Sequence, residues 1–248
     1  MTNEPEAQPA AFLTTRWSLV LAASAQASPD QRAALESLCS AYWYPLYAYV
    51  RRKGQDADTA RDLVQDFFAR LLERNDFSRA DPAKGRFRAY LLTALKHHLI
   101  NHAEHARAEK RGGGKQPLPL ELSPHDAETR FSLEPAVHDS PDRAFDREWA
   151  LIVLQRALAR LGEEQQSAGK SAAWMLLEPY LTTAEDLAPY ATLAARLSVT
   201  ENAIKISIHR LRKRYGELLR QEVADTLGGE GVEDELGVLF EALGGTPG

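Results

Sequence analysis

The sequence of residues 190–220 reads YATLAARLSVTENAIKISIHRLRKRYGELLR. It predicts two helices joined by a tight turn over residues 198–200, with Thr200 placed to cap the second helix. Apolar residues of the second helix recur at steps of three and four, which places them on one helical face. These residues are Ile204, Ile208, Leu211, Tyr215 and Leu218. The stretch therefore predicts a helix-turn-helix, a motif whose second helix can enter the major groove of DNA.

The opposite face of the second predicted helix is cationic. Residues 205–220 include six Lys or Arg and one acid, Glu217, so pairing within the helix cannot neutralise the charge. A solvated amphipathic surface helix is the alternative interpretation of this pattern. The charge balance favours an anionic partner instead. We expect DNA contacts from the turn and this face, at Thr200, Asn202, Lys205, His209, Arg210, Arg212 and Lys213.

Length and charge distribution favour two small helical domains. The chain has 248 residues, and its hydrophobic fraction of 44% is sufficient for packed cores. A uniform net charge of -5 would be repelled by nucleic acid. The charge is uneven, because residues 84–115 hold eight Lys or Arg and two acids, whereas no Lys or Arg follows Arg220. The basic segments are therefore candidate nucleic-acid contacts.

The residue patterns predict an all-α fold with five parts. Residues 1–14 are expected to form a disordered leader, 15–111 a helical domain, 112–140 a flexible Gly- and Pro-rich linker, 141–220 the helix-turn-helix domain and 221–248 an acidic tail. The tail is expected to be a solvated helix or a disordered segment. The alternative is an acidic flap that covers one of the basic faces.

Apolar periodicity predicts three main helices in the first domain, over residues 28–52, 58–73 and 86–110. The outward residues of the third helix are expected to be cations, histidines and Asn101, with Tyr90 near its start. A basic surface with an aromatic side chain at its edge can hold phosphates and stack unpaired bases. We therefore expect this helix to contact nucleic acid.

The cysteine and hydropathy patterns predict a soluble cytoplasmic protein. Cys39 is the single cysteine, which excludes an intrachain disulfide and suits a reducing compartment. Neither a cleavable leader nor an apolar run of membrane-spanning length is evident, so we expect no membrane partner.

The histidines of the third predicted helix raise the question of a metal site. His98, His102 and His105 lie at steps of four and three, and Glu109 continues that face, so metal binding is geometrically feasible. A second ligand cluster does not accompany them, and imidazoles on a basic helix serve equally well as DNA contacts. We therefore expect no metal and no cofactor, with a metal-dependent enzyme as a rival interpretation.

Three segments together resemble the extracytoplasmic-function (ECF) branch of the sigma-70 family. These segments are DLVQDFFARLL (62–72), FRAYLLTALKHHLINHA (87–103) and YATLAARLSVTENAIKISIHRLRKRY (190–215). Members of this family are dissociable specificity subunits of bacterial RNA polymerase and are not enzymes. The resemblance covers nearly the whole chain, and implies a sigma-2-like domain followed by a sigma-4-like domain. It also implies as partners the polymerase core, through its largest-subunit clamp and its flap, and promoter DNA.

The resemblance implies roles for individual residues. Docking on the clamp falls on Asp62, Gln65, Asp66 and Phe68. Recognition and melting of the minus-10 element fall on Arg88, Tyr90, Lys96, His97, His98, Asn101, Arg107, Lys110 and Arg111. Recognition of the minus-35 element falls on the cationic helix that contains Lys205, His209 and Arg210.

The docking helix departs from the family pattern at its start. Where the family has a run of acids, this chain has Thr59 and Arg61. One hypothesis is that phosphorylation of Thr59 by a Ser/Thr kinase restores a negative docking surface, and the alternative is an ordinary capping Thr. An anti-sigma factor is a further candidate partner. The rival function is a self-sufficient helix-turn-helix regulator, which would need to dimerise to span two half-sites.

Overall fold

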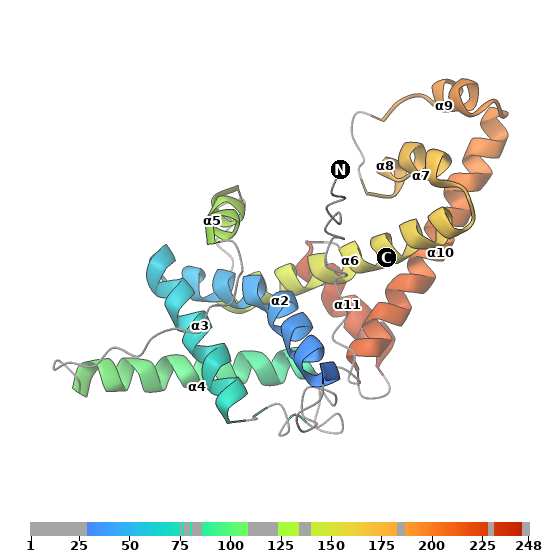
Figure 1. The fold of residues 1–248 in the computed structure, drawn as a ribbon. Helices are drawn as coiled ribbons and strands as arrows, with labels where there is room; N and C mark the ends of the chain where they lie inside the picture. The colour runs from blue at the N-terminus through green and yellow to red at the C-terminus, as the bar shows by residue number, and fades with distance from the viewer. Residues whose placement is uncertain are drawn as a thin grey trace, which may run out of the picture. The chain divides into compact units, whose positions relative to one another are not determined.

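The structure, a computed structural model, describes residues 29–74, 76, 80, 86–108, 124–133, 140–182, 187–227 and 231–244. Regular structure in these residues is helical throughout, which confirms the prediction of an all-α fold for this part of the chain (Figure 1). The helices are α2 (Pro29–Arg52), α3 (Ala57–Glu73), α4 (Phe87–Ala108), α5 (Pro124–Leu133), α6 (Pro141–Ser167), α7 (Ser171–Leu177), α8 (Pro179–Thr182), α9 (Tyr190–Leu197), α10 (Glu201–Thr226) and α11 (Val232–Ala242). Among these, no helix combines the length and the apolar character needed to cross a membrane.

The chain divides into two compact units. One comprises Met1–Ile152 together with Ala224–Gly248, and the other comprises Val153–Val223. Helices α6 and α10 each contribute residues to both units. The predicted leader lies outside the described residues, and the predicted domain boundaries stay predictions.

The core of the first unit is built around α2. All residues from 41 to 50 are buried, so this part of the helix is enclosed on every side, as its apolar and aromatic sequence favours. The ring centroid of Tyr42 lies 5.5 Å from that of Phe87 on α4 and 6.5 Å from that of Phe145 on α6. Beyond Arg52 the helix ends, and Gly54 adopts a φ of 90°, a left-handed conformation that favours glycine.

Helix α5 lies inside residues 112–140, which are predicted to form a flexible linker, and that prediction is wrong for residues 124–133. It packs on α2, where Arg51 donates to both carboxylate oxygens of Glu128 at 2.8 and 3.1 Å. Phe131 lies against the same helix, with the Arg51 guanidinium carbon 4.7 Å from its ring centroid. These contacts join residues more than 70 positions apart, so the local sequence does not reveal them.

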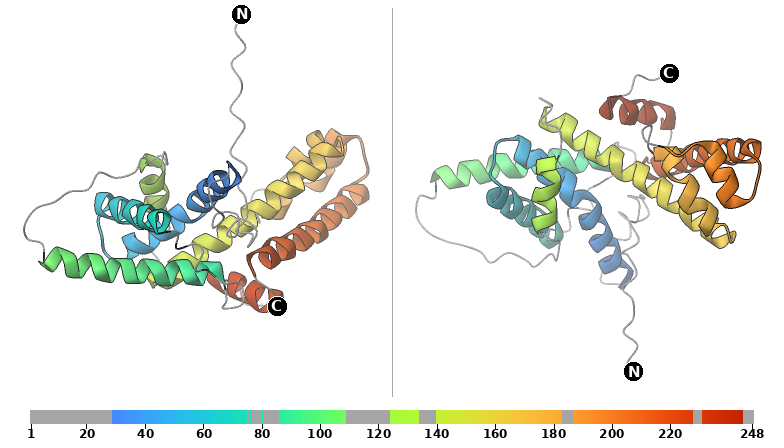
Figure 2. Two further views of the ribbon diagram at one scale, coloured as in Figure 1. Left: turned by 60° about the horizontal axis from the view of Figure 1, so that its bottom comes forward. Right: turned by 90° about the horizontal axis from the view of Figure 1, so that it is seen from above.

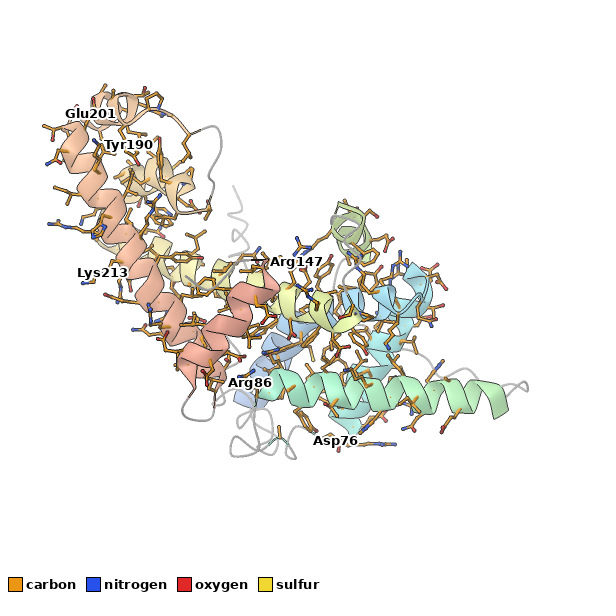
Figure 3. All side chains as sticks on the ribbon, turned by 180° about the vertical axis from the view of Figure 1, so that it is seen from behind. Asp76, Arg86, Arg147, Tyr190, Glu201 and Lys213 are labelled. Carbon is orange, nitrogen blue, oxygen red and sulfur yellow. The ribbon has the colours of Figure 1, made fainter. Side chains whose placement is uncertain are left out.

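The second unit contains the two helices predicted over residues 190–220. The predicted apolar face of α10 is confirmed, because Ile204, Ile208, Leu211 and Leu218 are buried and Tyr215 is half-buried. Glu201 and Lys213 mark the course of this helix in Figure 3. Ser198 ends α9 in a left-handed conformation with a φ of 55°. The Thr200 hydroxyl accepts a hydrogen bond from the amide of Ala203 at 3.2 Å, which confirms the predicted cap.

The C-terminal segment is more ordered than a solvated tail. Helix α10 continues to Thr226, and α11 follows over Val232–Ala242. On α11 the side chains of Glu235, Leu236 and Leu239 are buried. The expectation of a fully solvated or disordered tail is therefore wrong for this helix.

Candidate nucleic-acid interface

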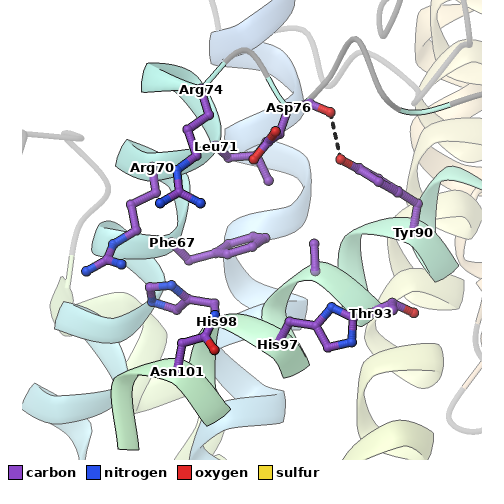
Figure 4. A pocket seen from close by; sticks show the side chains of 11 residues that line it. Phe67, Arg70, Leu71, Arg74, Asp76, Tyr90, Thr93, His97, His98 and Asn101 are labelled. Atoms are coloured by element: carbon purple, nitrogen blue, oxygen red, sulfur yellow. Dashed lines mark hydrogen bonds between the residues drawn. The ribbon is translucent and has the colours of Figure 1, made fainter. Parts of the chain in front are cut away.

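A cavity of about 440 Å³ lies between α3 and α4 of the first unit (Figure 4). Its walls combine aromatic rings, arginines, imidazoles and an amide. The lining residues are Phe67, Arg70, Leu71, Arg74, Asp76, Tyr90, Thr93, Ala94, His97, His98 and Asn101. The volume lies within the range of pockets that bind small organic groups.

Local helix geometry positions the aromatic and cationic walls. Phe67 and Arg70 on α3 and its C-cap residue Arg74 follow one another at steps of three and four, so they share the face turned toward α4 (Figure 4). Across the cavity the hydroxyl of Tyr90 donates to the backbone carbonyl of Asp76 at 2.6 Å, which orients the ring. Arginines beside aromatic rings can bind phosphate and stack against an unpaired base.

His98 is buried, and its predicted position on the outward face of the helix is wrong. Its ring centroid lies 5.7 Å from that of Phe67, and its Nε2 lies 3.5 Å from a carboxylate oxygen of Asp66. Burial lowers the pKa of His98 to about 4, because the interior disfavours the imidazolium and outweighs the attraction of Asp66. The neighbouring His97, by contrast, is exposed at the cavity.

Arg88 is also buried, with 8% of its surface exposed, and its predicted outward position is wrong as well. Its Nε donates to Glu235 at 2.8 Å, and its Nη1 pairs with Asp146. The guanidinium also lies 4.4 Å from the ring centroid of Trp149. Arg88 therefore contacts acids of the first unit in this structure, and its contact with DNA stays a prediction.

The other residues predicted to contact the minus-10 element differ in accessibility. Tyr90 is half-buried, Asn101 is exposed, and the partly exposed Lys96 pairs with Asp142. The side chain of Arg107 and the residues Lys110 and Arg111 lie outside the described part of the structure. Four of the nine residues thus line the cavity, namely Tyr90, His97, Asn101 and the buried His98.

The predicted docking residues divide between surface and core. Asp62 is exposed, while Gln65 and Asp66 are half-exposed, and Asp66 pairs with Arg70 at 2.9 Å. Phe68 has 1% of its surface exposed and packs on Phe67, with the ring centroids 5.5 Å apart. Phe68 is therefore a core residue in this structure, and a direct docking contact from its side chain is not available.

Asp56, rather than Thr59, caps the N-terminus of α3. Its carboxylate accepts the Thr59 amide at 2.9 Å and the Thr59 hydroxyl at 2.7 Å. These two hydrogen bonds lower the pKa of the Asp56 carboxyl. The alternative interpretation of Thr59 as the capping residue is therefore wrong, although its half-exposed hydroxyl takes part in the capping interaction.

The cationic face of α10 is accessible along its length. The residues predicted to contact the minus-35 element are all exposed: Thr200, Asn202, Lys205, His209, Arg210, Arg212 and Lys213. Arg212 also donates to the backbone carbonyl of Tyr180 at 2.9 Å, so it has a structural contact inside the second unit. This arrangement presents positive charge in a row that suits phosphates.

Phe67, Arg70 and Arg74 line the cavity but are not among the site residues predicted from the sequence. The spacing of Arg70 and Arg74 near the C-terminal end of a predicted helix is the signal that could have indicated a second basic surface. For metal binding, the described residues contain no group of three or more His, Cys, Asp or Glu side chains able to hold an ion.

Residues 40–109 match the family model of Sigma-70 region 2. The matched segment contains α3, α4 and every residue that lines the cavity. This match supports membership of the sigma-70 family and a role in transcription initiation. A region 2 segment implies binding to RNA polymerase core and to promoter DNA. Searches of curated proteins and of solved structures found no match.

Proposed function

We propose that this chain is a bacterial ECF-type sigma factor that directs RNA polymerase core to promoters and helps to melt them in the cytoplasm. The observation that carries the proposal is the match of residues 40–109 to Sigma-70 region 2. The same residues form a cavity lined by arginines and aromatic rings. Non-enzymatic recognition, without a cofactor, is sufficient for this function. The resemblance of residues 190–215 to the second DNA-binding domain of ECF factors adds to it.

Core docking is assigned to the exposed side of α3. Asp62 is exposed, and Gln65 and Asp66 lie nearby on the same helix. A carboxylate surface suits a basic clamp, because complementary charge speeds encounter and fixes orientation. The buried Phe68 would act indirectly, by holding α3 on the core of the first unit.

Capture of an unstacked base is assigned to the cavity between α3 and α4. Arg70 and Arg74 would hold the phosphates of one strand, while Tyr90 and His97 present ring surfaces to a base. Unstacking and unpairing a base costs a few kcal/mol, which stacking and charge contacts in such a site can offset. The cavity thereby links strand separation to binding of the melted strand.

Upstream recognition is assigned to the cationic face of α10, with Lys205, His209 and Arg210 directed at the minus-35 element. An exposed helix that follows a short helix and a three-residue turn is suited to the major groove. Two basic modules of modest affinity become effective when one polymerase carries both, because the second contact is then intramolecular. Free protein should therefore bind promoter DNA weakly.

Phosphorylation of Thr59 is proposed to strengthen core docking. A phosphate adds about 1.5 to 2 negative charges at neutral pH, and Thr59 lies in the first turn of α3, where negative charge is favoured. The modification would break the hydrogen bond from the Thr59 hydroxyl to Asp56. It would also offset the positive charge that Arg61 brings to this end of the docking helix.

Transcription with purified bacterial core polymerase tests the proposed function. The chain should bind core in a pull-down and should direct transcription from a subset of fragments in a genomic DNA library. An empty pull-down with both unmodified and kinase-treated protein would overturn the assignment. Comparison of unmodified with kinase-treated protein in the same experiment tests whether a Ser/Thr kinase is needed as a regulator.

A self-sufficient helix-turn-helix regulator is the second candidate function. The accessible cationic face of α10 favours it, since such a face could read an operator without polymerase. A gel shift on duplex DNA with the isolated protein separates the two candidates. Tight, sequence-specific binding in the absence of core polymerase would favour the regulator.

A further inference from the structure

The first unit carries a second feature that the proposed function does not use, namely a set of ion pairs at the N-terminal half of α4. Helix α11 lies near the N-terminal end of α4 (Figure 2). Its Glu235 contacts Arg86, which Figure 3 labels at that end of α4, at 2.6 Å and contacts Arg88 at 2.8 Å. Arg88 also pairs with Asp146, and Lys96 further along α4 pairs with Asp142. The basic half of α4 is thus neutralised by acids of α6 and α11.

The cations and the acids of these ion pairs come from different parts of the chain. Arg86, Arg88 and Lys96 belong to the segment that matches Sigma-70 region 2, residues 40–109. Asp142, Asp146 and Glu235 all lie outside it. These three cations are therefore paired with carboxylates that the family segment does not itself contain.

The burial of Glu235 distinguishes it from the other acids of α11. Its side chain has 1% exposure, whereas Glu233, Asp234 and Glu241 are exposed. A carboxylate is buried at high cost unless a cation compensates its charge, and here two arginines do so. A carboxylate between two guanidinium groups resembles a bound phosphate in its charge and in its capacity to accept hydrogen bonds from arginine.

We propose that α11 is an autoinhibitory latch, in which Glu235 stands in for a nucleic-acid phosphate and holds Arg86 and Arg88 away from DNA until DNA displaces it. The inference rests on the proposed function, because it regulates the same basic helix. In the closed state described here, Glu235 of α11 pairs with Arg86 and Arg88 at the N-terminal end of α4, and the net charge of that surface is reduced. In the open state the two arginines are free to bind the backbone of the melted strand.

A latch makes a prediction that a purely structural helix does not. Anions that bind α4 and the carboxylate of Glu235 compete for the same guanidinium groups, so each must weaken the binding of the other. Removing the charge of Glu235 should strengthen DNA binding, and adding DNA should loosen α11. A helix that only stabilises the fold would show neither effect.

The first experiment compares full-length wild type with Glu235→Gln and with the matched control Asp234→Asn, which removes one exposed charge from the same helix. The probe is a fluorescein-labelled single-stranded DNA of mixed sequence, titrated at several salt concentrations. We expect Glu235→Gln to bind about tenfold more tightly at low salt. The slope of log affinity against log salt should steepen by about 1.4, because each phosphate neutralised on single-stranded DNA contributes about 0.7. Asp234→Asn should resemble wild type.

The second experiment needs no substitution and so remains decisive where Glu235→Gln does not fold. Amide hydrogen exchange of residues 232–242 is measured in the wild-type chain with and without a saturating amount of the same DNA. We expect exchange in α11 to accelerate several-fold when DNA binds. Exchange that stays unchanged or slows would overturn the latch, as would a folded Glu235→Gln variant that binds DNA no better than wild type.

Failure of the latch and failure of the proposed function can be told apart. If wild type and Glu235→Gln bind the DNA equally well, α11 is a structural helix and the sigma-factor assignment is unaffected. If neither protein binds DNA even at about 50 mM salt, where backbone contacts are strong, the latch is overturned. The core-polymerase pull-down, which does not involve Glu235, then decides the proposed function by itself.

Discussion

Glu128 on α5 accepts hydrogen bonds from the Nε and Nη2 atoms of Arg51, 77 residues earlier on α2, at 3.1 and 2.8 Å. The Tyr47 hydroxyl donates to the same carboxylate. A fork of two parallel hydrogen bonds fixes both the distance and the orientation of the two helices. This contact makes α5 part of the first unit, although the sequence around it resembles a linker.

Replacing Glu128 should release α5 from α2. We expect Glu128→Ala to lower the free energy of unfolding by about 1 kcal/mol, a value typical of a partly exposed bidentate pair. Amide exchange over residues 124–133 should accelerate more than exchange in α2. Ser132→Ala, an exposed position on the same helix, is the control. Equal protection of α5 in Glu128→Ala and wild type would show that the pair does not hold the helix.

His98 should make stability depend on pH. Its pKa is about 4 in the folded protein and about 6.5 in an unfolded chain, so the unfolded state binds the proton preferentially between these values. The contribution of neutral His98 is complete above about pH 6.5 and is lost as the pH falls toward about 4. Between pH 7 and pH 5 we expect a loss of about 2 kcal/mol, which urea titrations can measure.

A His98→Gln variant provides the comparison for this pH dependence. Its side chain does not titrate, so the free energy of unfolding should change less than that of wild type between pH 7 and pH 5. A wild-type chain with the same pH dependence as the variant would contradict the assignment of a depressed pKa to His98.

The cationic face of α10 should act on upstream DNA alone. We expect Lys205→Ala or Arg210→Ala to weaken use of the minus-35 element about tenfold. Loss of one side chain that contacts a base or a phosphate has an effect of this size. Transcription from promoters with and without that element measures the effect. Binding to core polymerase should remain as in wild type, and a loss of core binding would show that the roles of the two units are wrongly divided.

The cavity arginines should act on melted DNA. Arg74 is exposed at the end of α3, so Arg74→Ala removes a cation from the cavity with little effect on packing. We expect the salt slope for single-stranded DNA to fall by about 0.7, together with weaker binding. Arg196→Ala, at an exposed position of the second unit, is a matched control and should leave this slope unchanged. An identical slope in Arg74→Ala and wild type would exclude Arg74 as a phosphate contact.

Substitutions of Thr59 should separate the effect of charge from that of the hydroxyl. Thr59→Glu adds a negative charge in the first turn of α3, where the helix dipole favours it, and should strengthen core binding several-fold. Thr59→Ala removes the hydrogen bond to Asp56 and should not respond to kinase treatment. Equal core affinity and equal transcription for both variants would end the phosphorylation hypothesis.

Local patterns predicted the helices well because their causes are local. The spacing of Ile204, Ile208 and Leu211 places them on one side of any α-helix, and the structure buries that side. Thr200 was predicted as a cap because its hydroxyl can reach an amide three residues ahead, and it does so. Such features depend on backbone geometry within one or two turns.

The candidate site was predicted less completely, because exposure depends on neighbouring elements. Arg88 and His98 belong to a helix with mixed polarity on every side, so its sequence does not show which cations face inward. Their burial follows from Glu235 and Asp146 in one case and from Phe67 and Asp66 in the other. None of those partners lies on α4 itself.

By itself, the amino-acid sequence determined that the described chain is helical, where α10 places its apolar face and where basic residues concentrate. Only the tertiary structure decided that α5 packs on α2, that a cavity opens between α3 and α4, and that Glu235 meets Arg88 across 147 positions. The physical reason is the distance along the chain over which each effect acts. Helical periodicity acts over a few residues, whereas burial and ion pairing depend on segments that become neighbours only after the chain has folded.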